Sequence, residues 1–207
     1  QSQGGTLLQR IKAMRKQLAV ELGIIVAPVR IRDNLQLESK EYQLLLKGVP
    51  IVKGEVMATQ FMAINPGNAE GKLSGIKTKE PAFGLEAYWI PDKEREQPQL
   101  YGYTIVDPAT VITTHLTEII KAHVYELLGR QETQHLVDTL AESYPKVVEE
   151  LIPNLMNIGT VQKVLQNLLK EKVSIFDLRT ILETLADYAA NVKDISVLTE
   201  LVRQALS

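Results

Sequence analysis

The chain contains no cysteine among its 207 residues. This absence excludes disulfide bonds, thiolate metal sites and cysteine nucleophiles, and it permits a reducing compartment without establishing one. Long apolar runs are also missing: none approaches the roughly 18 residues that a membrane-spanning helix needs. Residues 1–20 lack the apolar core of a secretory signal peptide. We therefore expect the chain as given to be soluble.

Neither sign of charge dominates the sequence. The 23 lysines and arginines nearly balance the 25 acidic residues, for a formal net charge of -2. This balance argues against a nucleic-acid-binding protein, because such proteins concentrate positive charge. Since 45% of the residues are hydrophobic, a chain of this length can bury a substantial core without a stabilising metal.

The first part of the chain mixes helical and strand patterns. Apolar residues at spacings of three and four predict an amphipathic helix over Thr6–Leu22, ended by Gly23. Short apolar runs predict strands over four segments further on. These segments are Ile24–Val26, Val29–Ile31, Glu41–Leu46 and Val49–Val52.

Residues from about Met57 to Asp107 are rich in glycine and proline. Such a density of helix breakers predicts short strands between long loops, at Gln60–Ile64, Leu85–Ile90 and Tyr101–Val106.

After Asp107 the pattern becomes helical. Asp107 is the expected N-cap of a helix that begins with Pro108 and extends to Gly129. Beyond Arg130 only short helices are indicated, with expected caps at Thr160, at Ser174 paired with Asp177, and at Asp194. The predicted fold class is α+β, with a mixed α/β first part, a small β-rich insertion and an all-helical last part.

No catalytic or cofactor-binding motif is present. The stretch from Gly67 to Ser74 differs from a phosphate-binding loop, because three residues rather than four separate Gly67 from Gly71, and Leu73 follows Lys72. The three histidines, His115, His123 and His135, lack metal-ligand spacing. We therefore predict no catalytic residue, no cofactor and no metal ligand.

One loop is a candidate interaction site. Pro81 biases Glu80 toward an extended backbone, and Gly84 permits a turn directly after the aromatic Phe83. From the residues alone, two interpretations stay open for Phe83: a plug in the core of its own subdomain, or an exposed apolar anchor.

Nine segments of the chain resemble the cytoplasmic region of the FlhA family, the export-gate proteins of flagellar and virulence type III secretion. They lie in unbroken order along nearly the whole sequence. They are Val29–Asn34, Tyr42–Gly48, Phe61–Gly67, Glu80–Leu85, Val106–Val111, Thr113–Leu116, Glu126–Gln131, Val164–Leu169 and Asp177–Leu185.

The resemblance implies three subdomains. The first would be discontinuous, over 1–58 and 108–127, with the second inserted at 59–107 and a helical third at 128–207. In the family a multi-span membrane region precedes this part and a fourth subdomain follows it. The present sequence would thus be a fragment that faces the cytoplasm at the bacterial inner membrane.

By the same resemblance, the chain would be a docking platform for flagellar export chaperones with their cargo. It would also contact other export-apparatus subunits, form a homo-nonameric ring in the full-length protein, and bind no nucleic acid. The family's chaperone-docking positions fall on Glu80, Phe83 and Thr114. Relatives usually carry aspartate at the first position, so a charge contact from Glu80 would have a longer reach.

Two other functions stay open at this point. The chain could be an enzyme with an unrecognised active site, which would need convergent polar groups in a cleft. It could also be a purely structural ring subunit with no affinity for chaperones.

Overall fold

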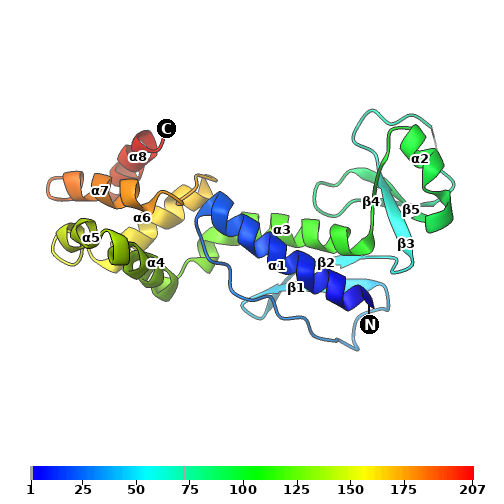
Figure 1. The fold of residues 1–207 in the computed structure, drawn as a ribbon, viewed down its shortest axis with the longest axis horizontal. Coiled ribbons are helices and arrows are strands. Elements are labelled where there is room, and N and C mark those ends of the chain that lie inside the picture. Colours follow the sequence, from blue (N-terminus) through cyan, green and yellow to red (C-terminus); the bar gives the residue numbers. More distant parts are fainter. Residues whose placement is uncertain (1, 72) are drawn as a thin grey trace. The chain divides into compact units, whose positions relative to one another are not determined.

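A computed structural model describes residues 2–71 and 73–207, with side chains from Thr6 onward (Figure 1). The chain forms two compact units. The first comprises residues up to Lys12 together with Val29–Ile119, and the second comprises Ala13–Pro28 and Ile120–Ser207. Each unit is described by itself below.

Helix α1 spans Ser2–Leu22, so the predicted helix is confirmed and begins earlier than expected. Its buried side chains recur every three or four residues, as an amphipathic helix requires. They are Ile11, Met14, Leu18 and Leu22.

Strands β1 (Glu41–Leu46) and β2 (Val49–Glu55) form a two-stranded antiparallel sheet in the first unit. Lys47 and Gly48 both adopt positive φ angles, of 51° and 83°. Two consecutive positive φ angles are what a tight two-residue hairpin turn of matching twist needs. The predicted hairpin is confirmed.

The expected strands at Ile24–Val26 and Val29–Ile31 are wrong, because neither segment pairs with another strand. The guanidinium of Arg15 donates to the carbonyl of Val26 from Nε at 2.9 Å and from a terminal nitrogen at 2.8 Å. A side chain thus occupies an acceptor that a ladder would use, and Pro28 has no N–H to offer.

A four-stranded antiparallel sheet forms the rest of the core of the first unit. Side chains alternate between its faces, since successive residues of a strand point to opposite sides. On one face Met62 and Trp89 pack with Val111, and on the other Ala63 and Ile90 pack with Tyr103. The strand order is β4 (Ile76–Lys79), β5 (Glu86–Pro91), β3 (Gln60–Ile64) and β6 (Thr104–Val106).

Two parts of this region differ from the sequence prediction. Strand β4 was not predicted, and the expected strand at Tyr101–Val106 is reduced to β6. The missing residues follow a short helix, α2 (Glu96–Leu100), which comes after the 3-10 turn η1 (Asp92–Glu94). Pro98 is tolerated in α2 because it lies in the first turn, where no intrahelical N–H is needed.

Helix α3 spans Pro108–Leu127. As predicted, Asp107 caps it: its Oδ1 accepts from the backbone N–H of Thr110 at 2.8 Å. The most buried side chains of α3 recur every one to four residues and include one histidine. They are Val111, His115, Leu116, Ile120 and Val124.

The last part of the second unit, residues 130–207, consists of helices and their connections without any strand, as predicted. Its core contains fully buried side chains from several of these helices, among them Leu165 of α6, Leu182 of α7 and Val202 of α8, each at 0% exposure. The helices are α4 (Arg130–Ser143), α5 (Pro145–Leu151), α6 (Ile158–Lys170), α7 (Leu178–Ala189) and α8 (Ile195–Ala205).

Of the three caps predicted here, Asp194 is confirmed, since its carboxylate accepts from the N–H groups of Ser196 and Val197. The cap at Thr160 is wrong: Asn157 caps α6 by accepting from the N–H of Thr160. Asp177 alone caps α7. A hydroxyl and an amide two or three residues apart are both good caps, so the sequence pattern did not separate them.

The mixture of helices and small antiparallel sheets confirms the α+β class. The division into three subdomains stays a prediction. Within residues 2–71 and 73–207, no helix has the combination of length and apolar character that a membrane span requires.

Candidate functional site

Phe83 lies in the six-residue loop 80–85, which connects β4 to β5. Its side chain is 61% exposed, and the neighbouring Leu85 is 37% exposed. An aromatic ring this exposed contributes little to a core, so the core-plug interpretation does not fit. The 80–85 loop instead presents two apolar side chains at the surface.

The buried side chain of Glu80 holds the 80–85 loop in place by hydrogen bonds. The residue is only 3% exposed. One carboxylate oxygen, Oε1, accepts from the N–H of Ala82, and the other, Oε2, accepts from the N–H of Phe83, both at 2.7 Å. Hydrogen bonds of this kind to an ionised acceptor are stronger than those between neutral groups.

The backbone of the same loop is closed by two further hydrogen bonds. The N–H of Glu80 donates to the carbonyl of Leu85 at 2.8 Å, and the N–H of Gly84 donates to the carbonyl of Glu80 at 2.9 Å. Gly84 has a φ of 71°, a conformation that a residue with a Cβ rarely adopts. The loop is thus held in one shape by its own polar groups.

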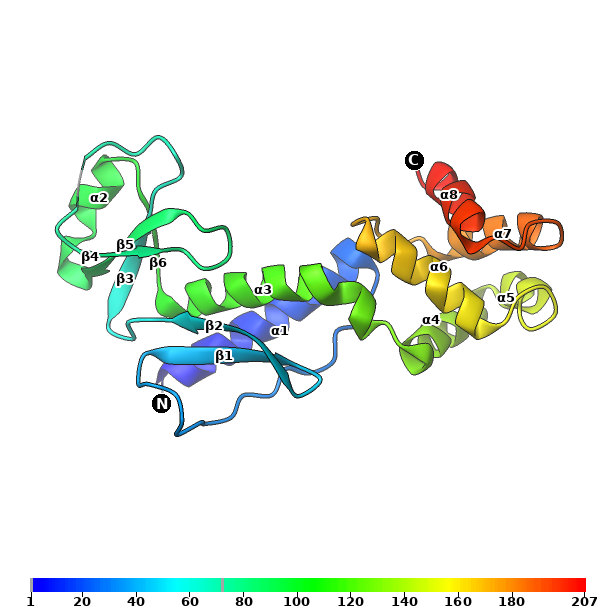
Figure 2. The ribbon, with the colours of Figure 1, turned by 180° about the vertical axis from the view of Figure 1, so that it is seen from behind.

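A polar cluster within the first unit consists of the half-buried Tyr42 and the buried His115 and Glu80. The hydroxyl of Tyr42 and Nδ1 of His115 are hydrogen-bonded at 2.7 Å, and the two rings meet edge to face at 5.8 Å between centroids. Glu80 interacts electrostatically with both side chains. Figure 2 shows the β4–β5 hairpin reaching over α3, which carries His115.

Two pKa values in this polar cluster are shifted. Burial lowers the pKa of His115, and the negative charge of Glu80 opposes the effect. Burial, followed by the charge of Glu80, raises the pKa of Tyr42. Both shifts favour uncharged side chains for Tyr42 and His115 at neutral pH.

The sequence did not point to Tyr42. Its partner across the sheet is Gly54, and a Cβ at that glycine would lie 2.4 Å from Cζ and from the hydroxyl oxygen of Tyr42. Glycine therefore leaves room for the tyrosine ring to lie against β2. A tyrosine opposite a glycine in a predicted hairpin is a signal that could have drawn attention to this position.

Thr114, the third predicted position, is half-buried on α3. It directly precedes His115, and neighbouring helical residues lie about 100° apart around the axis. The structure thus joins Glu80 and Phe83 by a direct hydrogen bond and places Thr114 next to His115, a member of the polar cluster.

The other motifs show no catalytic arrangement. His123 forms a hydrogen bond of 2.9 Å with Glu126 on the same helix face. Within residues 2–71 and 73–207, no three metal-ligating side chains lie close enough to hold an ion. Lys72, from the loop that differs from a phosphate-binding loop, lies outside the described residues.

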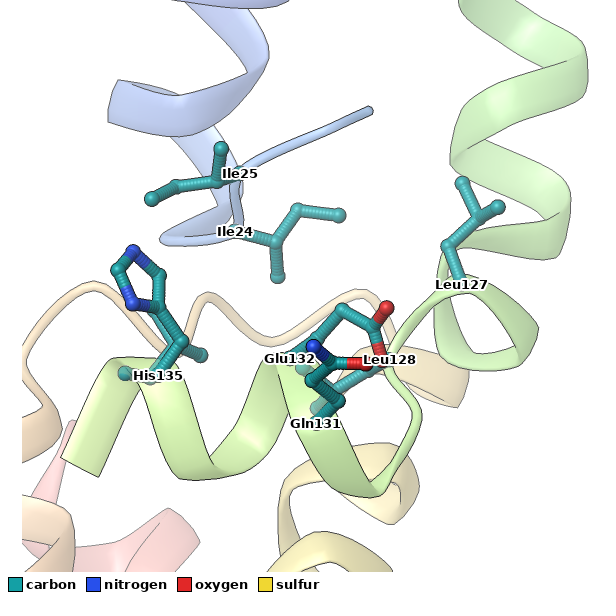
Figure 3. A pocket seen from close by; sticks show the side chains of 8 residues that line it. Ile24, Ile25, Leu127, Leu128, Gln131, Glu132 and His135 are labelled. Carbon is teal, nitrogen blue, oxygen red and sulfur yellow. The ribbon is translucent and has the colours of Figure 1, made fainter. Parts of the chain in front are cut away.

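A pocket of about 380 Å³ in the second unit is the cavity against which we tested the enzyme interpretation (Figure 3). Isoleucines 24 and 25 come from the segment after α1, whereas Glu132 and His135 come from α4. Glu132 and His135 stand at i and i+3, and no hydrogen bond between them is found in the described part of the chain. The lining is completed by Leu127, Leu128, Gln131 and Leu136.

The chain is similar to known proteins along its whole length. A model of the FHIPEP family matches residues 1–207. The flagellar biosynthesis protein FlhA of Bacillus subtilis is 52% identical over 206 residues, which cover 100% of this chain and 30% of the relative. FlhA of Escherichia coli is 49% identical over 204 residues, 99% of this chain and 30% of the relative. The chain thus spans about 30% of the length of these relatives.

Solved structures agree with this match. The Chlamydia pneumoniae CdsV protein superposes with a TM-score of 0.83 at 29% identity, covering 95% of this chain and 56% of that one. CdsV has also been solved in a complex with CdsO, with a TM-score of 0.84 at 30% identity over 94% and 60% of the two chains. Nonameric EPEC SctV-C superposes with a TM-score of 0.74 at 28% identity, over 97% and 60% of the two chains.

Proposed function

Because the chain belongs to the FHIPEP family, we propose that it is a docking platform of the flagellar type III protein export gate. In this role it binds export chaperones with their cargo and passes the cargo toward the export pore. The relatives at about 50% identity are flagellar biosynthesis proteins, which supports a flagellar rather than a virulence role.

The exposure of Phe83 is the observation that carries the proposal. Protein interfaces are anchored by a few aromatic side chains that enter an apolar pocket of the partner. Phe83 is 61% exposed, yet its own backbone N–H is fixed by the buried carboxylate of Glu80. A rigid support reduces the entropy that binding would otherwise cost. Thr114, half-buried on α3, would lie beside the incoming apolar group.

Titration of flagellar export chaperone–cargo complexes against the chain tests this function. Phe83→Ala should weaken binding by about 1 to 3 kcal/mol, as truncation of an aromatic anchor does, and should leave the thermal unfolding midpoint nearly unchanged. Phe176→Ala is a matched control, because Phe176 is 65% exposed and lies in the second unit. It should leave the affinity unchanged.

Two results would contradict the proposal. Equal effects of Phe83→Ala and Phe176→Ala would show that the 80–85 loop has no special role. A chain that assembles into rings in the full-length protein but binds no chaperone complex would favour the purely structural subunit.

Assembly and location belong to the same proposal. Nonameric SctV-C and the complex of CdsV with CdsO support a homo-nonameric ring that contacts other export-apparatus subunits. The ring would lie at the cytoplasmic face of the bacterial inner membrane. Crosslinking of the full-length protein in membranes, followed by sizing of the products, tests the nonamer.

A further inference from the structure

We propose that Glu80 is a positioning residue, which fixes the backbone of the 80–85 loop so that Phe83 is presented in one orientation, and that it is not a charge offered to the partner. This inference rests on the docking function proposed above. It concerns how the site works, and it reverses the role that the family resemblance suggested for this side chain.

The burial of Glu80 carries the first step. At 3% exposure, its carboxylate is not accessible to a cation on another protein. Both carboxylate oxygens already accept hydrogen bonds from N–H groups of the loop, at 2.7 Å each. A partner lysine or arginine would have to displace these bonds and open the loop before it could reach the charge.

The second step concerns which backbone groups are held. The two donors are the N–H groups of Ala82 and of Phe83 itself. A hydrogen bond at the backbone of Phe83 limits the directions in which the exposed ring can point. Restricting a loop in its binding conformation improves affinity because less conformational freedom is lost on association.

The third step is the chemical requirement for an acid at this position. A glutamine has nearly the same shape, but its amide offers one acceptor oxygen and one NH₂ group. The NH₂ group would face a backbone N–H, so one of the two bonds is lost. Aspartate keeps two acceptor oxygens, and its side chain commonly accepts from the N–H groups two and three residues later.

Hydrogen exchange measures the loop without any partner. In Glu80→Gln, the amide protons of Ala82 and Phe83 should exchange at least several-fold faster than in the unaltered chain, whereas Glu80→Asp should restore slow exchange. Glu94→Gln is the control, because it removes an exposed carboxylate from the same unit. Unchanged exchange of the Phe83 amide in Glu80→Gln would overturn the inference.

The second measurement is of affinity. It uses the chaperone–cargo complex that binds the unaltered chain most tightly. Glu80→Gln should weaken binding several-fold, and Glu80→Asp should bind nearly as well as the unaltered chain. In a Phe83→Ala background, Glu80→Gln should have no further effect, because the residue acts through the ring. Double-mutant cycles detect this kind of coupling.

The outcomes separate the two proposals. Additive losses from Glu80→Gln and Phe83→Ala would mean that Glu80 contacts the partner directly, and they would overturn the positioning role. Absence of binding by the unaltered chain would instead overturn the docking function. The exchange rates of the Ala82 and Phe83 amides are measured in either case.

Discussion

The hydroxyl of Tyr42 lies 2.7 Å from Nδ1 of His115 and joins the two-stranded sheet to α3 by a hydrogen bond. These residues are 73 positions apart in the sequence. His115 is 4% exposed, so its ring nitrogen has little access to water as an alternative partner. The bond therefore connects two elements of the first unit. It also gives the buried imidazole the hydrogen-bond partner that a buried polar group needs.

Removing the Tyr42 hydroxyl should destabilise the chain. Tyr42→Phe leaves Nδ1 of His115 without this partner, and a buried polar atom that loses its partner costs about 1 to 3 kcal/mol. The free energy of unfolding in urea measures the effect. Tyr101→Phe is the control, because the Tyr101 hydroxyl accepts from Gln97 at an exposed site. A loss as small as that of the control would contradict this account of the bond.

Acid should destabilise the fold through His115. Because burial lowers the pKa of His115 below its ordinary value of 6.5, the unfolded chain binds a proton more readily than the folded one. The free energy of unfolding should therefore fall as the pH drops below 6.5, and this contribution should level off once the folded state is also protonated.

Urea unfolding of His115→Gln at a series of pH values isolates this effect, since the variant lacks the titrating group that faces Tyr42 and Glu80. Its stability should depend less on pH between about 7 and 5. His135→Gln, at an exposed position of α4, is the matched control and should keep the slope of the unaltered chain. Identical slopes in all three proteins would argue against a role for His115.

Asp107 has two roles that its variants should separate. It caps α3 through Thr110, and its Oδ2 forms an ion pair of 2.6 Å with Arg10. Asp107→Ala removes both and should cost about 0.5 to 2 kcal/mol, whereas Asp107→Asn keeps a capping oxygen and should cost less. Thermal unfolding at neutral pH gives the order. Equal losses would show that the ion pair, rather than the cap, supports the start of α3.

The carboxylate of Asp107 should also make the stability of the fold depend on pH in the acid range. Burial works to raise the pKa of Asp107, but hydrogen bonds from Thr110 and the charge of Arg10 outweigh it and lower the pKa below the ordinary 3.8. Its contribution to stability is present above 3.8 and should be lost as the pH falls through the folded value. Asp107→Asn should lack this acid-dependent loss.

Gly23 should not tolerate a side chain. It has a φ of 77°, and a Cβ there would lie 2.3 Å from the backbone nitrogen of Phe176. Gly23→Ala therefore combines an unfavourable backbone conformation with a clash against the main chain, and should cost more than about 2 kcal/mol. Gly48→Ala has a similar φ of 83° but open space around the new methyl group. The excess destabilisation of Gly23→Ala over Gly48→Ala measures the clash.

Local patterns predicted the two long helices, α1 and α3, and most strands well, whereas the short helix α2 was not predicted. The bounds of β1 and β3 agree with the expected segments, because alternating side chains and a tight turn are encoded within a few residues. The segments at 24–26 and 29–31 were mistaken for strands because of their short apolar runs; in the first of them the carbonyl of Val26 accepts from Arg15 of the preceding helix instead. Strand β4 escaped prediction because its four residues, Ile76–Lys79, carry no apolar alternation strong enough to detect.

The candidate site was only partly visible in the sequence. The turn chemistry around Pro81 and Gly84 marked a constrained loop, but from residues alone the direction of the Phe83 ring stayed open. The electrostatic interaction of Glu80 with Tyr42 and His115 could not be inferred, because these two residues lie far away in the chain. Contacts between such distant residues follow from tertiary structure rather than from local spacing.

The close approach of Gly54 to Tyr42 has a consequence for sequence variation among relatives. With only 2.4 Å between a Cβ at position 54 and the tyrosine hydroxyl, a side chain at position 54 would push the Tyr42 ring out of its present place. Relatives that replace the glycine should carry a smaller residue at the tyrosine position, and they should then lack the hydrogen-bond partner of the buried histidine. Positions 42, 54 and 115 are therefore expected to co-vary among relatives.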